Sequence, residues 1–354
     1  MSAWLGNPWA VGLGLIVVAV ASWGATGAVL RLLIAWRIYD EPNHRSSHAN
    51  PKPRGGGLAV VAVVLAAWTA AAAIDGYHHM GFWLFVAGAL LLAAVSWADD
   101  LKPRPASLRF GVQVAAVALG LWILQPEMLV FQGLLPLSAD RVLAALLWLW
   151  FVNLFNFMDG IDGITAVETI TIGGGLAAVS ALTFGFSLGV FMAAAPAAAA
   201  FGFLYWNWAP SRIFLGDVGS VPLGYLLGGL LIVAAAGGLW AAALILPLYY
   251  LADASITLAK RALRREKLWR AHREHFYQRA VQRGFSHAAV ATRILLCNAV
   301  LVALALVAVL AQPTLSPWIP VALASLAVIA LLFILARQAP PGAHSGPARP
   351  ESAS

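Results

Sequence analysis

Charged residues and cysteine are both scarce in this sequence. Only 10% of the 354 residues are Asp, Glu, Lys or Arg and 61% are hydrophobic, whereas ordinary soluble domains carry about 25% charged residues. A soluble chain is therefore excluded. So few polar residues also exclude an intrinsically disordered chain, and the single cysteine, Cys297, excludes a disulfide within the chain.

Apolar runs long enough to cross a bilayer are what the sequence has in abundance. A membrane-spanning helix needs roughly 20 mostly apolar residues, and short polar or glycine-containing breaks separate the runs. They cover residues 8–36, 57–74, 81–98, 108–124, 141–158, 164–184, 187–208, 219–236, 238–258, 288–311 and 318–336. The sequence thus predicts an all-α, polytopic integral membrane protein with about 11 transmembrane helices.

Residues 1–336 are expected to form a single transmembrane domain, and residues 337–354 a cytoplasmic tail. The first apolar run is too long for the core of a signal peptide and no basic stretch precedes it, so it is expected to remain as a helix. The tail is rich in Pro, Gly, Ala and Ser and lacks the apolar content needed to pack, which predicts disorder.

Lysine and arginine are distributed asymmetrically between the two sides of the predicted helices. Short loops rich in these residues stay cytoplasmic. If the amino terminus lies outside, Arg141 is the only one of the 22 basic residues that lies clearly outside, and the carboxyl terminus is expected in the cytoplasm. The net charge of +7 reflects this asymmetry, because no soluble basic domain accompanies it. Anionic lipid headgroups and anionic substrates are the expected partners, and nucleic acid is not.

The fifteen acidic residues are distributed unevenly. Three separate segments place carboxylates at the predicted cytoplasmic helix ends: Asp99, Asp100, Asp159, Asp162 and Asp217. Helix packing can bring these segments to one site on one membrane face. Mg²⁺ prefers oxygen ligands and is usually shared with substrate phosphates, so the segments predict a Mg²⁺ site, with Mn²⁺ as the alternative metal. Taken alone, the Asp99-Asp100 pair fits a solvated helix end beside Lys102 equally well.

Amide side chains and glycines accompany two of these segments. Asn153, Asn156, Asp159 and Asp162 follow an apolar helix, and the glycines beside them let the backbone approach a ligand closely. A mere turn needs fewer polar groups, which favours a binding site here.

The third segment, residues 207–220, combines an aromatic side chain with a carboxylate. Phe214 precedes Asp217, which lies in a glycine-flanked turn that opens a new helix, and helix amino ends attract phosphate. Asn207 is a candidate polar contact, although the tryptophans beside it are more typical of a membrane anchor.

Two basic segments allow two interpretations each. The loop 40–57, which contains Arg54, mixes bases with proline and glycine and can grip an anion, but a positive-inside loop has similar charge without a ligand. The segment His272-Arg273-Glu274-His275 places two histidines three residues apart, on one face if helical. The arginines around them fit a phosphate-facing surface or an amphipathic helix lying on the bilayer. Zinc is not expected, because no third ligand pattern is present.

Five motifs in this order resemble the polyprenyl-phosphate N-acetylhexosamine-1-phosphate transferases, members of glycosyltransferase family 4. This superfamily includes phospho-MurNAc-pentapeptide translocase and the initiating GlcNAc-1-phosphate transferases of bacterial envelope polysaccharides. The resemblance runs from about residue 40 to residue 290. It rests on residues 48–57 with Pro-Arg-Gly-Gly-Gly, Asp99-Asp100 with Arg109-Phe-Gly-Val-Gln113, residues 153–163, residues 207–220 and the histidine segment.

The resemblance implies a reaction in the bacterial inner membrane, with the active site on the cytoplasmic face. A phosphate oxygen of undecaprenyl phosphate attacks the β-phosphorus of a UDP-N-acetylamino sugar, which releases UMP and leaves undecaprenyl-diphospho-sugar. This Mg²⁺-dependent step initiates a cell-envelope polysaccharide such as lipopolysaccharide O-antigen. We expect a direct single displacement, since the metal-binding and base candidates are separate residues.

The resemblance also implies a role for each site residue. Asp217 ligates Mg²⁺ together with Asn156, and Asp99 deprotonates or positions the lipid phosphate with Asp100 beside it. Phe214 stacks on uracil. His272 and His275 bind the diphosphate and help to assemble the site. The remaining substrate-binding candidates are Arg54, Asn153, Asn156, Asp159, Asp162, Asn207, Arg273 and Glu274.

One position departs from the pattern of this family. Members of the GlcNAc-type branch commonly read His-x-His-His, so Glu274 stands where a histidine is expected. The variant resembles the O-antigen-initiating branch that accepts 6-deoxy sugars such as UDP-N-acetylfucosamine or UDP-N-acetylquinovosamine. No motif covers Asp253, which is expected to face the site or a polar cavity.

Three matters stay open from the sequence. A transporter or lipid flippase is the competing class, although transporters place ionisable groups near the bilayer midplane. A CDP-alcohol phosphotransferase gathers its aspartates in one continuous motif, unlike the three segments here. The oligomeric state is undetermined, with a homodimer as one option.

Overall fold

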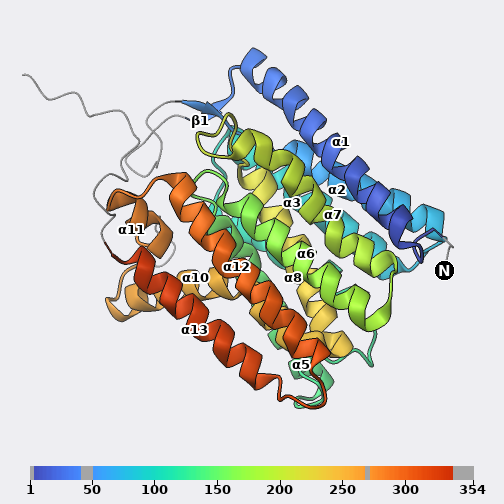
Figure 1. Ribbon diagram of the computed structural model, residues 1–354. Coiled ribbons are helices and arrows are strands. Elements are labelled where there is room, and N and C mark those ends of the chain that lie inside the picture. Colours follow the sequence, from blue (N-terminus) through green and yellow to red (C-terminus); the bar gives the residue numbers. More distant parts are fainter. Residues whose placement is uncertain (1–3, 41–50, 268–271, 338–354) are drawn as a thin grey trace, which may run out of the picture.

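The computed structural model describes residues 4–40, 51–267 and 272–337, and its architecture is all-α, as the sequence predicts (Figure 1). The long helices are α1 (Pro8–Ala35), α2 (Gly57–Asp75), α3 (Met80–Leu101), α4 (Ala106–Gly120), α5 (Leu137–Phe157), α6 (Ile164–Phe184), α7 (Leu188–Asn207), α8 (Asp217–Ala234), α10 (Leu248–Leu263), α12 (His287–Leu310) and α13 (Trp318–Leu335). The short elements are β1 (Tyr39–Asp40), β2 (Lys52–Pro53), η1 (Leu121–Ile123), η2 (Ala235–Leu239), α9 (Trp240–Ile245) and α11 (Phe276–Gln282). The tail beyond residue 337, predicted to be disordered, and the early loop at 41–50 lie outside the described residues.

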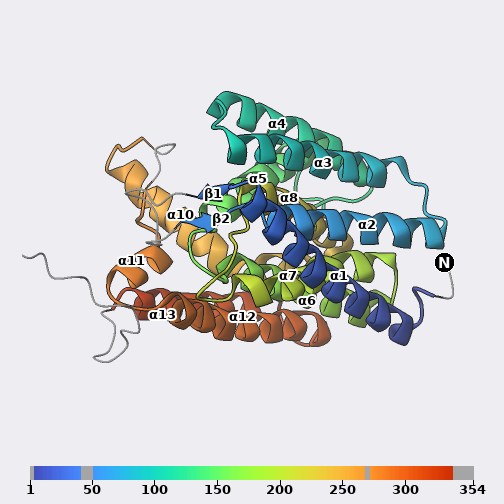
Figure 2. The ribbon, with the colours of Figure 1, turned by 90° about the horizontal axis from the view of Figure 1, so that it is seen from above.

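Helix α8 is the centre of the bundle. It packs against α2, α3, α5 and α6, and nearly all of its residues are buried. Figure 2 shows it between α3 and α4 on one side and α12 and α13 on the other. An aromatic cluster fixes it in place, since the Tyr225 ring lies 4.9 Å from that of Trp148 and 5.0 Å from that of Phe85. The indole of Trp148 donates to the Tyr225 carbonyl and the Tyr225 hydroxyl donates to the Ala116 carbonyl, so the polar tips are satisfied.

The outer helices turn large apolar side chains away from the core. Trp9, Leu13 and Ile16 on α1 are exposed, as are Leu326 and Phe333 on α13. Water disfavours such surfaces and lipid does not, because apolar surface gains free energy on leaving water. In the described part of the chain, ten helices are long and apolar enough to cross a membrane. The protein is therefore a multi-pass membrane protein.

The ninth predicted helix, 238–258, is wrong as a continuous spanning helix. The chain kinks at Gly238, whose φ is +90°, and it breaks again at Pro247, just before α10. Proline has no amide N–H to donate within a helix, so two shorter helices, α9 and α10, replace the single one. Lys260 and Arg261 in the last turn of α10 further reduce its apolar length.

Helices α9 and α10 nevertheless lead from one end of the bundle to the other. At one end the ring of Trp240 lies 4.9 Å from that of Trp318, where α13 begins. At the other end α10 reaches α11, and Arg283 donates to the carbonyl of Ala336 just after α13. The amino-terminal Trp4 contacts Phe191 at the start of α7, so the two ends of the described chain lie at opposite ends of the bundle (Figure 2). Which end faces the cytoplasm stays a prediction from the distribution of charge.

Candidate active site

The early basic loop and the turn before α8 are joined by backbone hydrogen bonds. The amides of Gly55 and Gly56 both donate to the Phe214 carbonyl, at 3.1 and 2.9 Å, and the Phe214 amide donates to Pro53 at 2.9 Å. Glycine is required at this junction, because a Cβ on Gly57 would lie 2.2 Å from the Cα of Gly219. The pairing places the side chain of Arg54 across the amino end of α8.

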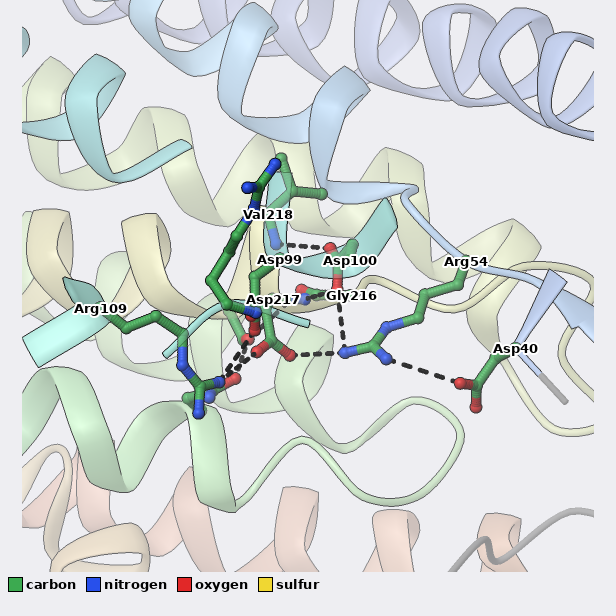
Figure 3. A network of polar contacts seen from close by, with 11 residues as sticks. Asp40, Arg54, Asp99, Asp100, Arg109, Gly216, Asp217 and Val218 are labelled. Carbon is green, nitrogen blue, oxygen red and sulfur yellow. Dashed lines mark hydrogen bonds and ion pairs between the residues drawn. The ribbon is translucent and has the colours of Figure 1, made fainter. Parts of the chain in front are cut away.

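Arg54 joins two of the predicted carboxylates. Its Nη2 lies 2.6 Å from Asp217 Oδ1 and 2.9 Å from Asp100 Oδ1, and its Nη1 lies 3.5 Å from Asp40 (Figure 3). Burial opposes the charge of Arg54, but the carboxylates of Asp217, Asp100 and Asp40 raise its pKa above the ordinary value. Asp100 also accepts from the amides of Asp217 and Val218, at 3.1 and 2.9 Å. This carboxylate therefore caps α8.

Arg109 joins the third carboxylate to the same group. Its Nη1 lies 2.8 Å from Asp99 Oδ2 and 3.8 Å from Asp217 Oδ2. Asp99 also accepts from the Arg104 amide at 2.6 Å. The structure thus brings Asp99, Asp100 and Asp217 together with two guanidinium groups at one end of the bundle (Figure 3). We call these five side chains the carboxylate-arginine cluster.

The segment after α5 lies beside this cluster. Asn156 Oδ1 accepts from the hydroxyl of Ser220 on α8 at 2.6 Å. Burial raises the pKa of Asp159 to about 6 against the opposing hydrogen bond from Thr165, and the negative charge of Asp217 adds to the shift. Asn153 faces α4 instead, where its amide donates to Gln113 at 2.8 Å. The pKa of Asp159 is therefore set mainly by burial, with a smaller contribution from the charge of Asp217 in the cluster.

Asp162 and Asn207 are engaged by the protein's own loops. Ser211 donates to Asp162 from its hydroxyl at 2.7 Å and its amide at 3.1 Å, and Lys52 and His287 lie 3.6 and 3.4 Å from Oδ2. Burial opposes ionisation, but the hydrogen bonds from His287 and Ser211 and the charge of Lys52 lower the pKa of Asp162 to about 2. Asn207 accepts from the Gly163 amide and donates to the Ile213 carbonyl. Both side chains join segments that are distant in sequence.

Phe214 is covered on one ring face by a residue that the sequence reasoning missed. The Nζ of Lys52 lies 5.1 Å from the centroid of the Phe214 ring and 3.0 Å from the Ser211 hydroxyl. His287 was missed as well. The Pro-Lys-Pro-Arg run around Lys52 is a signal that could have identified it, because prolines flank Lys52 on both sides. His287 opens an apolar helix and has no comparable signal.

The histidine segment packs against the end of α5. The rings of His272 and His275 stack with centroids 4.9 Å apart, and the Tyr277 hydroxyl donates to the Phe157 carbonyl at 3.1 Å. Burial, the neighbouring His275 and the charge of Arg261 lower the pKa of His272 to about 4. His272 is therefore neutral at pH 7.

Glu274 lies among arginines from the end of α10 and from α11. Arg264 and Arg279 both donate to its Oε2, the latter at 2.9 Å, and Arg261 Nε lies 3.8 Å from Oε1. The hydrogen bond from Arg264 lowers the pKa of Glu274. The neighbouring Arg273 carbonyl accepts from Gln282 at 3.0 Å. These contacts show that Glu274 links the histidine segment to the end of α10 and to α11 through ion pairs, independently of any ligand.

The donor chemistry of the carboxylate-arginine cluster fits a hard divalent cation. Among the described residues, no three His, Cys, Asp or Glu side chains form a ready ligand group. Mg²⁺, however, is usually held by one or two carboxylates and completes its shell with water and substrate phosphates. Asp217 provides such a carboxylate, and its Oδ2 lies 3.8 Å from Arg109 Nη1. Asn156 provides an amide oxygen on the adjacent helix end.

Fold and site together define a polytopic membrane protein with an acidic site, neutralised by arginines, at one end of its helices. Residues 82–235, from α3 into η2, match the model of glycosyl transferase family 4. The chain is 30% identical over 273 residues to phospho-N-acetylmuramoyl-pentapeptide-transferase of Mycobacterium leprae, which covers 60% of this chain and 73% of the relative. This chain belongs to glycosyl transferase family 4.

Two further relatives carry other names. The chain is 28% identical over 278 residues to a probable undecaprenyl-phosphate N-acetylglucosaminyl 1-phosphate transferase of Bacillus subtilis, covering 74% of this chain and 75% of the relative. It is 29% identical over 240 residues to decaprenyl-phosphate N-acetylglucosaminephosphotransferase of Mycolicibacterium smegmatis, covering 60% and 57%. Both of these names contain a polyprenyl phosphate and an N-acetylglucosamine phosphate, and the name of the M. leprae relative contains a phospho-N-acetylmuramoyl group.

Proposed function

We propose that this protein transfers an N-acetylamino-sugar 1-phosphate from a UDP-sugar to undecaprenyl phosphate, at the cytoplasmic face of the bacterial inner membrane. The carboxylate-arginine cluster carries the proposal, because it gathers Asp99, Asp100 and Asp217 at one end of a membrane bundle. An isoprenoid chain stays in lipid, while its phosphate must reach such an end. The names of the relatives support a polyprenyl phosphate as the acceptor and an N-acetylamino-sugar phosphate as the transferred group.

The reaction is a direct displacement at phosphorus. A phosphate oxygen of the lipid attacks the β-phosphorus of the UDP-sugar, the bond from that phosphorus to the oxygen bridging it to UMP breaks, and UMP leaves. Catalysis of this kind depends on charge neutralisation and in-line positioning. Arg54 and Arg109 lie within reach of the same carboxylates and can bind phosphate oxygens when they exchange partners. Asp99 positions or deprotonates the lipid phosphate, with Asp100 fixed beside it.

A bound Mg²⁺, or Mn²⁺ in its place, would be held by Asp217 and Asn156. When bound, the ion supplies neutralisation of the diphosphate charge. Phe214 stacks on uracil, and Lys52, already beside that ring, is near enough to meet the diphosphate. Asp159 lines the nucleotide side of the pocket. His272 and His275, in the histidine segment, bind the diphosphate and complete the site.

Glu274 bears on which sugar is used. We assign this chain to the branch that initiates O-antigen with a 6-deoxy sugar such as N-acetylfucosamine or N-acetylquinovosamine. The support is the carboxylate at a position where histidine is usual, together with the arginines that hold it there. A carboxylate in place of an imidazole changes which hydroxyl or phosphate groups can be bound.

The decisive experiment is UMP release by the purified protein. Undecaprenyl phosphate and Mg²⁺ are supplied with UDP-GlcNAc, UDP-GalNAc, UDP-N-acetylfucosamine or UDP-N-acetylquinovosamine in turn. Release that depends on the lipid phosphate is expected, with the 6-deoxy sugars preferred. A protein that binds none of these ligands and releases no UMP would contradict the proposal and favour a transporter or flippase. Trapping a phosphorylated Asp99 or Asp100 without lipid acceptor would contradict the single displacement.

A further inference from the structure

Asp253, on α10, is a fully buried carboxylate outside the carboxylate-arginine cluster. Burying a charge is costly unless hydrogen bonds satisfy it. Two donors come from its own helix, the hydroxyls of Tyr249 and Thr257, at 3.2 and 3.3 Å. Three come from His275 and the start of α11: the amides of Phe276 and Tyr277, at 3.0 and 3.3 Å, and Nδ1 of His275 at 3.2 Å. Most of its donors therefore belong to a segment more than twenty residues away.

The contact with His275 determines which ring nitrogen carries a proton. Both oxygens of Asp253 accept from backbone amides and hydroxyls, so this carboxylate is an acceptor toward Nδ1 as well. His275 must therefore hold a proton on Nδ1, and in the neutral ring Nε2 is then the acceptor. Because His275 is itself buried and stacks on His272 and Tyr277, its ring has little freedom to turn. One carboxylate thus fixes the tautomer while its neighbours fix the plane of the ring.

We propose that Asp253 is the positioning residue of the active site: it holds His275 in the Nδ1–H tautomer and fixes its ring beside His272. Asp253 itself touches no substrate and acts through the imidazole. The inference rests on the proposed function only for what His275 acts on, since the tautomer follows from the contact itself. It also gives a role to an acidic residue that no sequence motif covers.

The geometry separates this role from a purely structural one. Tyr249 and Thr257 donate hydrogen bonds to the carboxylate of Asp253, and neither hydrogen bond involves His275. Tyr249→Phe and Thr257→Val each remove one hydrogen bond from Asp253 and leave the contact with His275 in place. They are the matched controls for removal of the carboxylate, because all three residues are buried on one helix.

The test combines the ¹⁵N spectrum of histidine with steady-state kinetics. Full-length protein labelled with ¹⁵N-histidine is studied in detergent micelles or lipid, and the His275 signals are assigned by their loss in His275→Gln. Wild type is expected to show protonated Nδ1 and unprotonated Nε2. In Asp253→Ala this fixed form is lost and kcat for UMP release falls by at least about tenfold, a typical effect of removing a group that orients a histidine. The KM for undecaprenyl phosphate stays within about twofold of the wild-type value, and the two controls keep both the spectrum and kcat.

Two results would overturn the inference. One is an unchanged His275 spectrum in folded Asp253→Ala, and the other is the same loss of the Nδ1–H form in Tyr249→Phe or Thr257→Val. If Asp253→Ala does not fold, Asp253→Asn decides, because its amide NH₂ can donate to Nδ1 and so allows the ring to adopt the other tautomer. Its His275 signals must then show the Nε2–H form, and a spectrum with the Nδ1–H form alone would contradict the proposal. A wild-type protein that turns over no UDP-sugar would contradict the proposed function, while the spectrum still tests the tautomer.

Discussion

Replacing Asp162 by asparagine is expected to destabilise the protein at neutral pH. This carboxylate receives two hydrogen bonds from Ser211 and lies close to Lys52 and His287, so it joins the loop before α2, the loop after α5 and the start of α12. The amide in the variant keeps the shape but loses the charge. One of its two polar atoms also becomes a donor facing the donors of Ser211.

The magnitude follows from the pKa of Asp162, which the fold lowers from 3.8 to about 2. A difference of about 1.8 pH units is worth about 2 kcal/mol at 1.36 kcal/mol per unit. Because the folded-state pKa is the lower one, this stabilisation is fully present above the unfolded value, from about pH 5 upward. It is lost as the pH falls from about 4 to 2. The side chain is buried, so solvent screening takes little from this figure.

The assay is thermal unfolding of wild type and Asp162→Asn in the same detergent between pH 7 and pH 2.5. The variant is expected to unfold at a lower temperature at pH 7, and the gap should narrow as the pH falls below 4. Equal midpoints at pH 7, or a gap that stays constant down to pH 2.5, would refute the reasoning. Asp140→Asn is a poor control because Asp140 is also an ion-pair partner, whereas the solvent-facing Glu127→Gln provides a suitable one.

Three other substitutions test separate parts of the site. Asp159→Asn should raise the unfolding temperature at pH 7 while lowering activity. Folding raises the pKa of Asp159 to about 6, so the ionised carboxylate lowers the stability of the folded protein as the pH rises from about 4 to 6. A gain in stability of the variant over wild type that is larger at pH 4 than at pH 7 would contradict this. Gly57→Ala should reduce both stability and UMP release, because its Cβ would collide with Gly219. The control, Gly24→Ala on the exposed side of α1, should change the unfolding free energy by no more than about 1 kcal/mol. Equal behaviour of the two alanine variants would show that the close contact between Gly57 and Gly219 is not needed. Asp217→Asn should reduce UMP release at least about 100-fold in a monodisperse protein, as expected on removal of a metal-binding and charge-stabilising group, and retained turnover at saturating Mg²⁺ would show that its assignment is wrong.

The helices were predictable from the sequence because lipid imposes a simple requirement on length and polarity. Each run of about 20 apolar residues became a helix, except that Pro247 divides residues 238–258. The kink at Gly238 lies at the predicted boundary of that run, whereas proline is common in membrane helices and Pro247 therefore gave no signal of a break. The amphipathic α10 is the consequence, with Asp253 on its buried side.

The carboxylates were also predictable, whereas their partners were not. Acidic residues are so few that five of them at helix ends stand out. The contact of Asp162 with His287, however, joins residues 125 positions apart, and the contact of Asp253 with His275 depends on a loop that returns to α10. Such pairs depend on tertiary packing, which no local pattern in one sequence encodes. Lys52 was predictable in part: the composition of residues 40–57 predicted a basic loop, but not that Lys52 would lie over the ring of Phe214.

The pairing of residues 53–57 with Phe214 and Leu215 has a consequence for biosynthesis. Gly55 is made about 160 residues before its partner Phe214, which at 5–20 residues per second is roughly 8 to 32 s of translation. During that interval α1 to α7 can enter the membrane while the loop carrying Arg54 has no partner strand and no α8 to cap. The carboxylate-arginine cluster can therefore form only once the eighth helix has been made, and a nascent chain that stalls before α8 can enter the membrane but has no complete cluster.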